Sequence, residues 1–232
     1  MTRSALIVAH GQPSDPAPAE ADLAQLCASV RALMPDWQVQ SATLAMPGAL
    51  EQALDRLDAP LIFPFFMADG WFTRTELPRR LAAGGAAGSR ILPAFGLMAA
   101  VTDLAVAAVR TAILGRGWKI GETVLVLAAH GSGRSPAPAK AADLIKAAIA
   151  KALALREIRL GFIEEEPSLQ IAATDAGAQT LCLPLFVANW GHVRMDVPAS
   201  LQAAAFRGPC LAPLGARPEV PALIARAIDV GL

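Results

Sequence analysis

The chain contains three histidines, and each stands next to a glycine. His10 and His130 directly follow short apolar runs, and His192 follows Gly191. Imidazole is a common metal ligand and also exchanges a proton near neutral pH. The three histidines are therefore the first candidates for chemistry.

Three consecutive acids, Glu164, Glu165 and Glu166, form a second candidate group. Side chains alternate in an extended segment, so Glu164 and Glu166 share one face and Glu165 takes the other. The pattern does not say which face meets a site. A solvated turn before Pro167 would explain the same residues without any chemistry.

The chain repeats itself at an offset of 120 residues. Ala9-His10-Gly11 matches Ala129-His130-Gly131, and Pro47, Pro64 and Pro78 match prolines at the same offset. A constant offset across several matches predicts an internal duplication. We expect an N-terminal half of residues 1–115 and a C-terminal half of residues 116–232, divided near Gly115-Arg116-Gly117.

Each half alternates short apolar runs with helical patterns. This order predicts two doubly wound parallel-sheet α/β domains, related by a pseudo-twofold axis, with a cleft between them. The expected strands are Ala5–Ala9, Gln38–Leu44, Leu61–Phe66, Val124–Ala129, Glu157–Ile163 and Thr180–Phe186. The expected helices are Ala19–Leu33, Leu50–Leu57, Ala99–Leu114, Lys140–Leu155, Leu169–Ala176 and Glu219–Val230.

This reading places all three histidines at one edge of the molecule. Ligands of such folds bind outside the carboxyl ends of the strands. His10 and His130 end a strand, and His192 lies a few residues past another. The edge that faces the cleft is therefore the expected site.

Composition excludes several classes of protein. The chain is 54% hydrophobic and 17% charged, with zero formal net charge, which gives no reason to expect nucleic acid as a partner. Pro, Gly, His or charged residues interrupt every apolar run before the roughly 20 residues that a membrane span needs. The three cysteines are far apart and form no C-x-x-C pair, which favours a reducing cytoplasm.

Three segments carry a resemblance to a known family. They are Leu125–Gly131, Gly161–Leu169 and Leu183–Pro198, the last reading Pro-Leu-Phe followed by Gly-His-Val and Asp-Val-Pro. With these segments the chain resembles the class II tetrapyrrole chelatases, of the sirohydrochlorin cobaltochelatase and ferrochelatase type. The resemblance implies insertion of a divalent metal into a tetrapyrrole without ATP, and the chain contains no G-x-x-x-x-G-K-[ST] motif.

The resemblance also implies that His130 and His192 hold the metal beside the macrocycle. The first half departs from this pattern, because Phe72 stands where the second half has His192. Ala45 and Met46 likewise replace Glu165 and Glu166. The second half should therefore carry the working site, and the first half should form an opposite wall.

Such a reaction needs a base for two pyrrole protons and cations for a carboxylated substrate. His130, His192, Glu164 and Glu166 are the expected catalytic residues. The expected substrate-binding residues are His10, Ser132, Arg134, Trp190 and Arg194. Three of them have other interpretations: Arg194 could pair with Asp196, Trp190 could pack in its loop, and His10 could be a relic or a ligand at a second site.

The expected activity is insertion of Co²⁺ or Fe²⁺ into sirohydrochlorin or a close relative, in cobalamin or siroheme biosynthesis. No prosthetic group is expected, since the divalent metal is a substrate. The partners would be a tetrapyrrole and, at most, a second copy of the chain, with monomer and homodimer both open. Two alternatives are a ferrochelatase that acts on a porphyrin and a carrier that binds a tetrapyrrole or metal without turnover.

Overall fold

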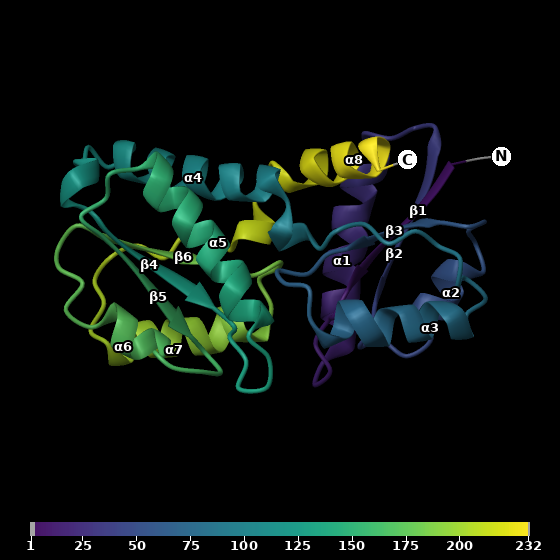
Figure 1. Ribbon diagram of the computed structural model, residues 1–232, viewed down its shortest axis with the longest axis horizontal. Helices are drawn as coiled ribbons and strands as arrows, with labels where there is room; N and C mark the ends of the chain where they lie inside the picture. Colours follow the sequence, from purple (N-terminus) through teal and green to yellow (C-terminus); the bar gives the residue numbers. More distant parts are fainter. Residues whose placement is uncertain (1–2, 232) are drawn as a thin grey trace. The chain divides into compact units, whose positions relative to one another are not determined.

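The computed structural model describes residues 3–231, which form two compact α/β units (Figure 1). Unit 1 contains the residues up to Gly96 and those from Pro218 onward. Unit 2 contains Leu97–Arg217.

Unit 1 is built on a three-stranded parallel sheet in the order β2-β1-β3. The long helix α1 covers β2 and packs against α8, and α2 lies against β2 on the other face. The bounds are β1 Arg3–Ala9, α1 Pro16–Ala32, β2 Trp37–Thr43, α2 Ala49–Leu54, β3 Leu61–Pro64, α3 Leu77–Ala83 and α8 Val220–Val230.

Unit 2 repeats this topology with the strand order β5-β4-β6, again parallel. Helices α4 and α5 pack together on one face, and α6 and α7 pack together on the other (Figure 1). The bounds are α4 Ala99–Leu114, β4 Val124–Ala129, α5 Ala137–Ala152, β5 Glu157–Phe162, α6 Leu169–Ala173, β6 Thr180–Pro184 and α7 Val197–Ala203.

The central strands are apolar because both of their faces are covered. Every residue of β4 is buried, and so is every residue of β1 after Arg3. Val124, Val126 and Ala128 point into the core beneath α6 and α7. The alternate residues, such as Leu125 and Leu127, take the opposite face, as the period of two in a strand requires. Continuous apolar runs are thus the expected sequence of buried parallel strands.

The predicted strands and helices are all present, with ends that shift by a few residues. The runs Val124–Ala129 and Ala99–Leu114 have the predicted bounds. β3 and β6 are shorter than predicted, because each ends at a proline, Pro64 and Pro184. α1 and α5 begin about three residues earlier than predicted, with a proline in the first turn.

The compact units divide the chain differently from the repeat. The repeat predicts that α4 belongs to the first half and α8 to the second, with the boundary near Gly115. In the structure α4 packs on α5 in unit 2, and α8 packs on α1 in unit 1. Each helix carries an apolar stripe, and such a stripe identifies a buried face but not the sheet that it covers.

Two short π-helical turns were not predicted. They span Phe72–Glu76 in unit 1 and His192–Asp196 in unit 2, and each leads directly into an α-helix, α3 and α7 respectively. π-Helical turns are rare and occur often at functional sites.

None of the helices described between residues 3 and 231 combines the length and the apolar character that a membrane crossing requires.

Candidate functional site

His130 lies at the carboxyl end of β4, in a turn that the neighbouring strand holds in place. Its carbonyl oxygen accepts a hydrogen bond from the backbone N–H of Glu164, at 2.8 Å. The next residue, Gly131, has φ +74°, and a Cβ there would lie 2.7 Å from Cγ of Glu165. Only glycine fits this turn without strain, so the Ala-His-Gly motif has a direct structural reason.

His192 is the first residue of the π-helical turn that follows β6. β4 and β6 are parallel neighbours, so their carboxyl ends lie at the same edge of the sheet. This arrangement brings the two histidines together across 62 residues of chain. Their ring centroids are 4.6 Å apart, and the ring planes are nearly perpendicular, at 83°.

Both rings use Nδ1 for a hydrogen bond within unit 2. Nδ1 of His130 lies 2.9 Å from the carbonyl oxygen of Gly131, and Nδ1 of His192 lies 2.8 Å from Oδ2 of Asp196. These oxygens only accept, so Nδ1 carries the proton in each ring. The lone pair of each neutral ring is then on Nε2, which is the tautomer that a metal-binding histidine needs.

Asp196 joins the candidate site through His192, although the sequence indicated it only as a partner of Arg194. The signal was the i, i+4 spacing of His192 and Asp196, which brings side chains together on a helix. A carboxylate behind a ligand histidine fixes its orientation and raises its basicity. The side chains of His192 and Asp196 are 42% and 48% exposed, so the pair lies at the surface of unit 2.

Unit 1 shows the same arrangement without a second imidazole. Nδ1 of His10 lies 3.0 Å from the carbonyl oxygen of Gly11, as in the His130 turn. The ring of Phe72 packs edge-on against His10, with centroids 4.2 Å apart. Phe72 therefore takes the place of His192, and His10 has one apolar ring where His130 has a potential co-ligand.

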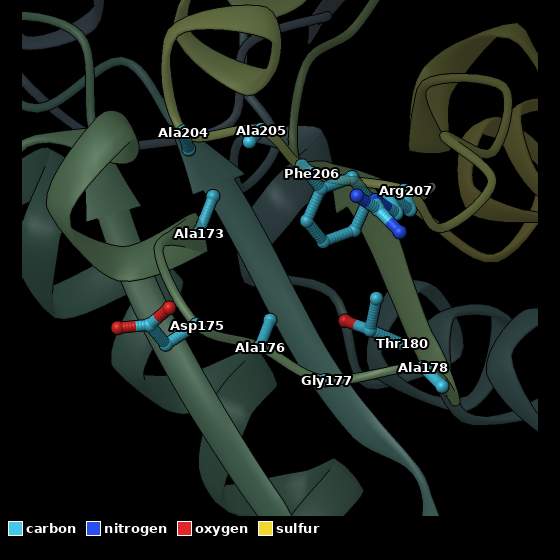
Figure 2. Close-up of a pocket in the computed structure, with 10 residues that line it drawn as sticks. All are labelled: Ala173, Asp175, Ala176, Gly177, Ala178, Thr180, Ala204, Ala205, Phe206 and Arg207. Atoms are coloured by element: carbon cyan, nitrogen blue, oxygen red, sulfur yellow. The ribbon is translucent and has the colours of Figure 1, made fainter.

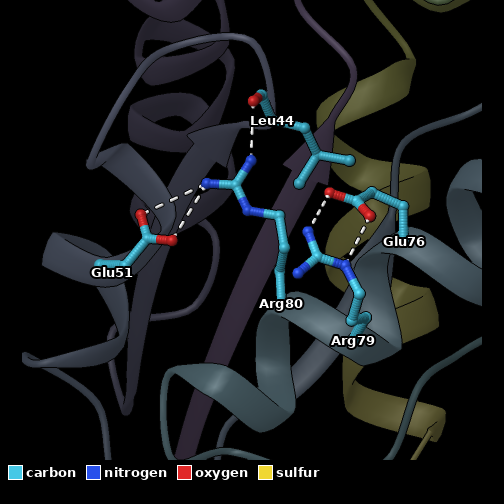
Figure 3. Close-up of polar contacts among 5 residues, drawn as sticks. All are labelled: Leu44, Glu51, Glu76, Arg79 and Arg80. Carbon is cyan, nitrogen blue, oxygen red and sulfur yellow. Dashed lines mark hydrogen bonds and ion pairs between the residues drawn. The ribbon is translucent and has the colours of Figure 1, made fainter.

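The acid of the π-helical turn is also used differently in unit 1. Glu76 holds the position that corresponds to Asp196, but it binds the guanidinium of Arg79 at 2.7 and 2.9 Å (Figure 3). The position that corresponds to Arg79 in unit 2 is Ala199. Without a competing cation there, the carboxylate of Asp196 is left to bind His192.

The structure gives the three acids three different surroundings. β5 ends at Phe162, so the acids lie in a bend past the strand rather than in an extended segment. Glu165 accepts a hydrogen bond from the backbone N–H of Ser132, at 3.2 Å, and this bond links Glu165 to the loop after His130. Glu166 accepts from the N–H of Ser168, at 2.8 Å, just before α6. Glu164 is exposed, and its backbone is bonded to His130.

The other candidate residues lie on the same edge of unit 2, except for His10. Ser132 and Arg134 are in the loop after His130, and the side chain of Arg134 is exposed. Trp190 is half-buried in the segment between β6 and the π-helical turn, and Arg194 is exposed within that turn. Two arginines and a tryptophan thus lie in the chain segments next to the two histidines, within one unit.

A hollow of about 360 Å³ lies at the other end of the unit 2 sheet (Figure 2). Its lining includes Thr180, the first residue of β6, together with Phe206 and Arg207. The histidine pair is at the carboxyl end of the parallel strands, so this hollow is not part of the candidate site.

The metal-binding potential of the site rests on two imidazoles. Between residues 3 and 231, no group of three or more His, Cys, Asp or Glu side chains is arranged to hold a metal ion. Two neutral ligands hold a divalent ion loosely and leave most of its coordination positions free for other donors. Such a site is suited to passing a metal on rather than storing it.

Comparisons with known proteins give a consistent result. The sequence model of the CbiX family matches residues 124–230. A solved structure described as CbiX, the terminal enzyme for biosynthesis of siroheme in denitrifying bacteria, is 49% identical and has a TM-score of 0.91. The match covers 99% of this chain and 100% of that one.

Two more distant structures share the fold. SirB from Bacillus subtilis, solved with Fe³⁺, is 16% identical with a TM-score of 0.76, and the match covers 99% of this chain and 95% of that one. DR2241 from Deinococcus radiodurans, a multi-domain protein with structural similarity to chelatases, is 19% identical with a TM-score of 0.75. This match covers the whole chain but 56% of the other protein. A search of curated proteins found no match.

The paired parallel sheets and these matches define a chelatase of class II. Within that class, the chain belongs to the CbiX family.

Proposed function

We propose that this chain inserts a divalent metal, Co²⁺ or Fe²⁺, into sirohydrochlorin or a closely related tetrapyrrole without ATP, in siroheme or cobalamin biosynthesis. The observation that carries the proposal is the His130–His192 pair, with ring centroids 4.6 Å apart and both Nδ1 atoms engaged. The similar CbiX structure, described as the terminal enzyme of siroheme biosynthesis, supports the substrate class.

The metal would bind as a substrate to Nε2 of both histidines. Imidazole ligands suit Co²⁺ and Fe²⁺, so the donor set supports either ion. Neither imidazole brings a negative charge, and the hold on the ion is correspondingly weak. The pyrrole nitrogens can then replace the protein ligands as the macrocycle takes the ion.

The macrocycle must lose two N–H protons as the metal enters. Glu164 is the best placed of the three acids, because Glu165 and Glu166 already accept backbone hydrogen bonds. Its backbone N–H binds the carbonyl oxygen of His130, which keeps it next to the pair. We therefore assign Glu164 as the proton acceptor, and Arg134 and Arg194 as cations for the substrate carboxylates.

We also propose that the two units arose by internal duplication and that unit 1 has lost its metal pair. The matching strand orders support this origin, and so do the π-helical turns at an offset of 120 residues. Phe72 in place of His192 supports the loss.

An anaerobic insertion assay tests the proposed activity. Sirohydrochlorin is mixed with Co²⁺ or Fe²⁺, and its visible spectrum is followed with and without the protein. We expect acceleration over the metal-only control, and near-complete loss of the acceleration in His130→Ala and His192→Ala. Parallel reactions with a porphyrin distinguish a ferrochelatase from the proposed enzyme.

Two outcomes would contradict the proposal. One is a His192→Ala protein that keeps the full rate. The other is tight binding of Co²⁺ or of the finished metallotetrapyrrole with no acceleration of insertion, which would instead support a carrier.

A further inference from the structure

Two cysteines stand opposite each other in unit 2, away from the histidine pair, and Cys210 lies outside the named strands. Cys182 in β6 forms a parallel bridge with Cys210. The N–H of Cys182 donates to the carbonyl oxygen of Pro209 at 2.9 Å, and the N–H of Leu211 donates to that of Cys182 at 2.8 Å. These two bonds flank Cys210, so the two cysteines are in register and their side chains share one face of the sheet.

This register suits a covalent link between the sulfurs. Neighbouring strands lie about 4.7–4.9 Å apart. Disulfides span Cα separations of roughly 4.4–6.8 Å. Both cysteines are free thiols in the structure, and the Cys210 thiol donates to the carbonyl oxygen of Leu211 at 3.8 Å.

The two thiols differ in a way that assigns their roles. Cys182 is fully buried, whereas Cys210 is exposed. The hydrogen bond between them lowers the pKa of the Cys210 thiol, and together with burial it raises the pKa of the Cys182 thiol well above its ordinary value. Cys210 is therefore the accessible sulfur with more thiolate character, and the thiolate is the nucleophile that reacts with oxidants.

We propose that Cys182 and Cys210 form a reversible disulfide when the protein meets a hydroperoxide. The Cys210 thiolate attacks the peroxide oxygen and breaks the O–O bond, which gives a sulfenic acid and, after protonation, an alcohol or water. The Cys182 sulfur then attacks the sulfenic sulfur. The S–S bond forms, and the hydroxyl group leaves with the Cys182 proton as water. Two external thiols reverse the change by exchange.

Unit 1 shows what ordinary packing looks like at this place. Its corresponding parallel bridge joins Ile62 and Ile91, and Ile91 packs against the apolar core cluster that contains Ile62. A sheet of this topology therefore does not need sulfur here. The link would also close the chain segment that contains His192 and Asp196, so it bears on the site without using any residue of it.

Mass spectrometry of the wild-type protein tests the proposal without any substitution. The reduced native protein is treated with hydrogen peroxide, unfolded, alkylated and digested. We expect the loss of two hydrogen atoms, a peptide pair joined through Cys182 and Cys210, and a fall from three alkylated cysteines to one. Dithiothreitol should restore all three.

The third cysteine supplies the matched control. Cys27 is buried in α1, and its thiol donates to the carbonyl oxygen of Val39. Cys27→Ala should keep the disulfide, whereas Cys210→Ser should abolish it and leave the other two thiols free. Because Cys210 is exposed, Cys210→Ser should still fold, and far-ultraviolet circular dichroism checks this.

Three results would overturn the proposal. The first is that all three thiols survive peroxide, and the second is that Cys210 proceeds to sulfinic acid with Cys182 still alkylated. The third is a disulfide between two chains through Cys210, detected as a dimer on a non-reducing gel.

Discussion

The carboxylate of Asp196 determines how His192 can act. It binds Nδ1 at 2.8 Å and leaves the lone pair on Nε2. Unit 1 contains the natural comparison, because Glu76 occupies the corresponding turn but binds Arg79. The two π-helical turns therefore differ in the partner of their acidic residue, which is His192 in unit 2 and Arg79 in unit 1.

We predict that Asp196→Ala lowers metal insertion about 10- to 100-fold, with Asp196→Asn closer to wild type. The amide oxygen of Asn can still accept the Nδ1–H bond, but it lacks the charge that raises basicity. Steady-state rates at varied Co²⁺ and varied sirohydrochlorin should show a weaker apparent affinity for the metal and a nearly unchanged KM for the tetrapyrrole. Glu76→Ala is the matched control and should insert metal at the wild-type rate; equal losses in both variants would contradict the assignment.

At the scale of elements, the turns after the strands place the functional groups. The His130 turn depends on Gly131, since its positive φ and the close contact with Glu165 exclude any other side chain. We predict that Gly131→Ala destabilises unit 2 by about 1–2 kcal/mol and reduces insertion sharply, because it displaces His130. Urea unfolding and the insertion assay measure the two effects.

Gly133→Ala is the control for this change, because an added Cβ there would meet nothing closer than 3.9 Å. It should alter neither stability nor rate. A Gly131→Ala protein with wild-type activity would show that the turn does not set the position of His130.

In unit 1, the turn after β2 is held in place by Arg80, a residue of α3. Arg80, with a side chain only 17% exposed, donates to the carbonyl oxygen of Leu44 at 2.8 Å and to Glu51 at 3.1 Å (Figure 3). A backbone hydrogen bond, opposed by partial burial and assisted by Arg80, lowers the pKa of Glu51 below 4.5. This carboxylate therefore stabilises the fold above pH 4.5, and its contribution is lost as the pH falls through the lowered value.

We predict that Arg80→Gln lowers the free energy of unfolding by about 1–2 kcal/mol near neutral pH, allowing for the half-exposed position of Glu51. The difference from wild type should shrink as the pH falls through the lowered pKa of Glu51, because protonation of Glu51 leaves the Arg80–Leu44 bond alone. Urea titrations at neutral pH and at an acidic pH below that value measure it. Arg79→Gln loses only an exposed pair with Glu76 and should change the free energy of unfolding less at both pH values. If the difference between Arg80→Gln and wild type grew on acidification, the role given to Glu51 would be refuted.

At the scale of the whole molecule, the chain crosses between the units twice, near Gly96 and near Arg217. These crossings give α4 to unit 2 and α8 to unit 1. We predict that a fragment of residues 97–217 folds and binds Co²⁺ through the histidine pair. A fragment of residues 116–232, cut at the sequence repeat, should fold poorly, because it lacks α4 and leaves the face of α5 uncovered.

Thermal unfolding followed by circular dichroism, with Co²⁺ titration by calorimetry, compares the two fragments. His192→Ala in the 97–217 fragment controls for nonspecific binding of the metal. If the 116–232 fragment unfolds as cooperatively and at as high a temperature as the 97–217 fragment, the packing of α4 on α5 is not needed for folding.

Much of this architecture could be predicted from local sequence. The bounds of β4 and α4 follow from an apolar run and an apolar stripe, and the glycine after each of His10 and His130 follows from a turn with positive φ. The candidate pair His130 and His192 came from a motif, and the parallel strand order explains why they meet. The separate surroundings of Glu164, Glu165 and Glu166 were not predictable, because they depend on contacts with the His130 loop and the start of α6.

The amino-acid sequence alone specifies the alternating strands and helices, the repeat at 120 residues and the side chains able to bind a metal. These properties are encoded locally, in hydrophobic period, turn residues and donor chemistry. Tertiary packing then places α4 in unit 2 and α8 in unit 1, opposite to their expected halves, and it makes Asp196 the partner of His192. Both outcomes have one cause, because an apolar stripe or a carboxylate can satisfy several partners and packing selects one of them.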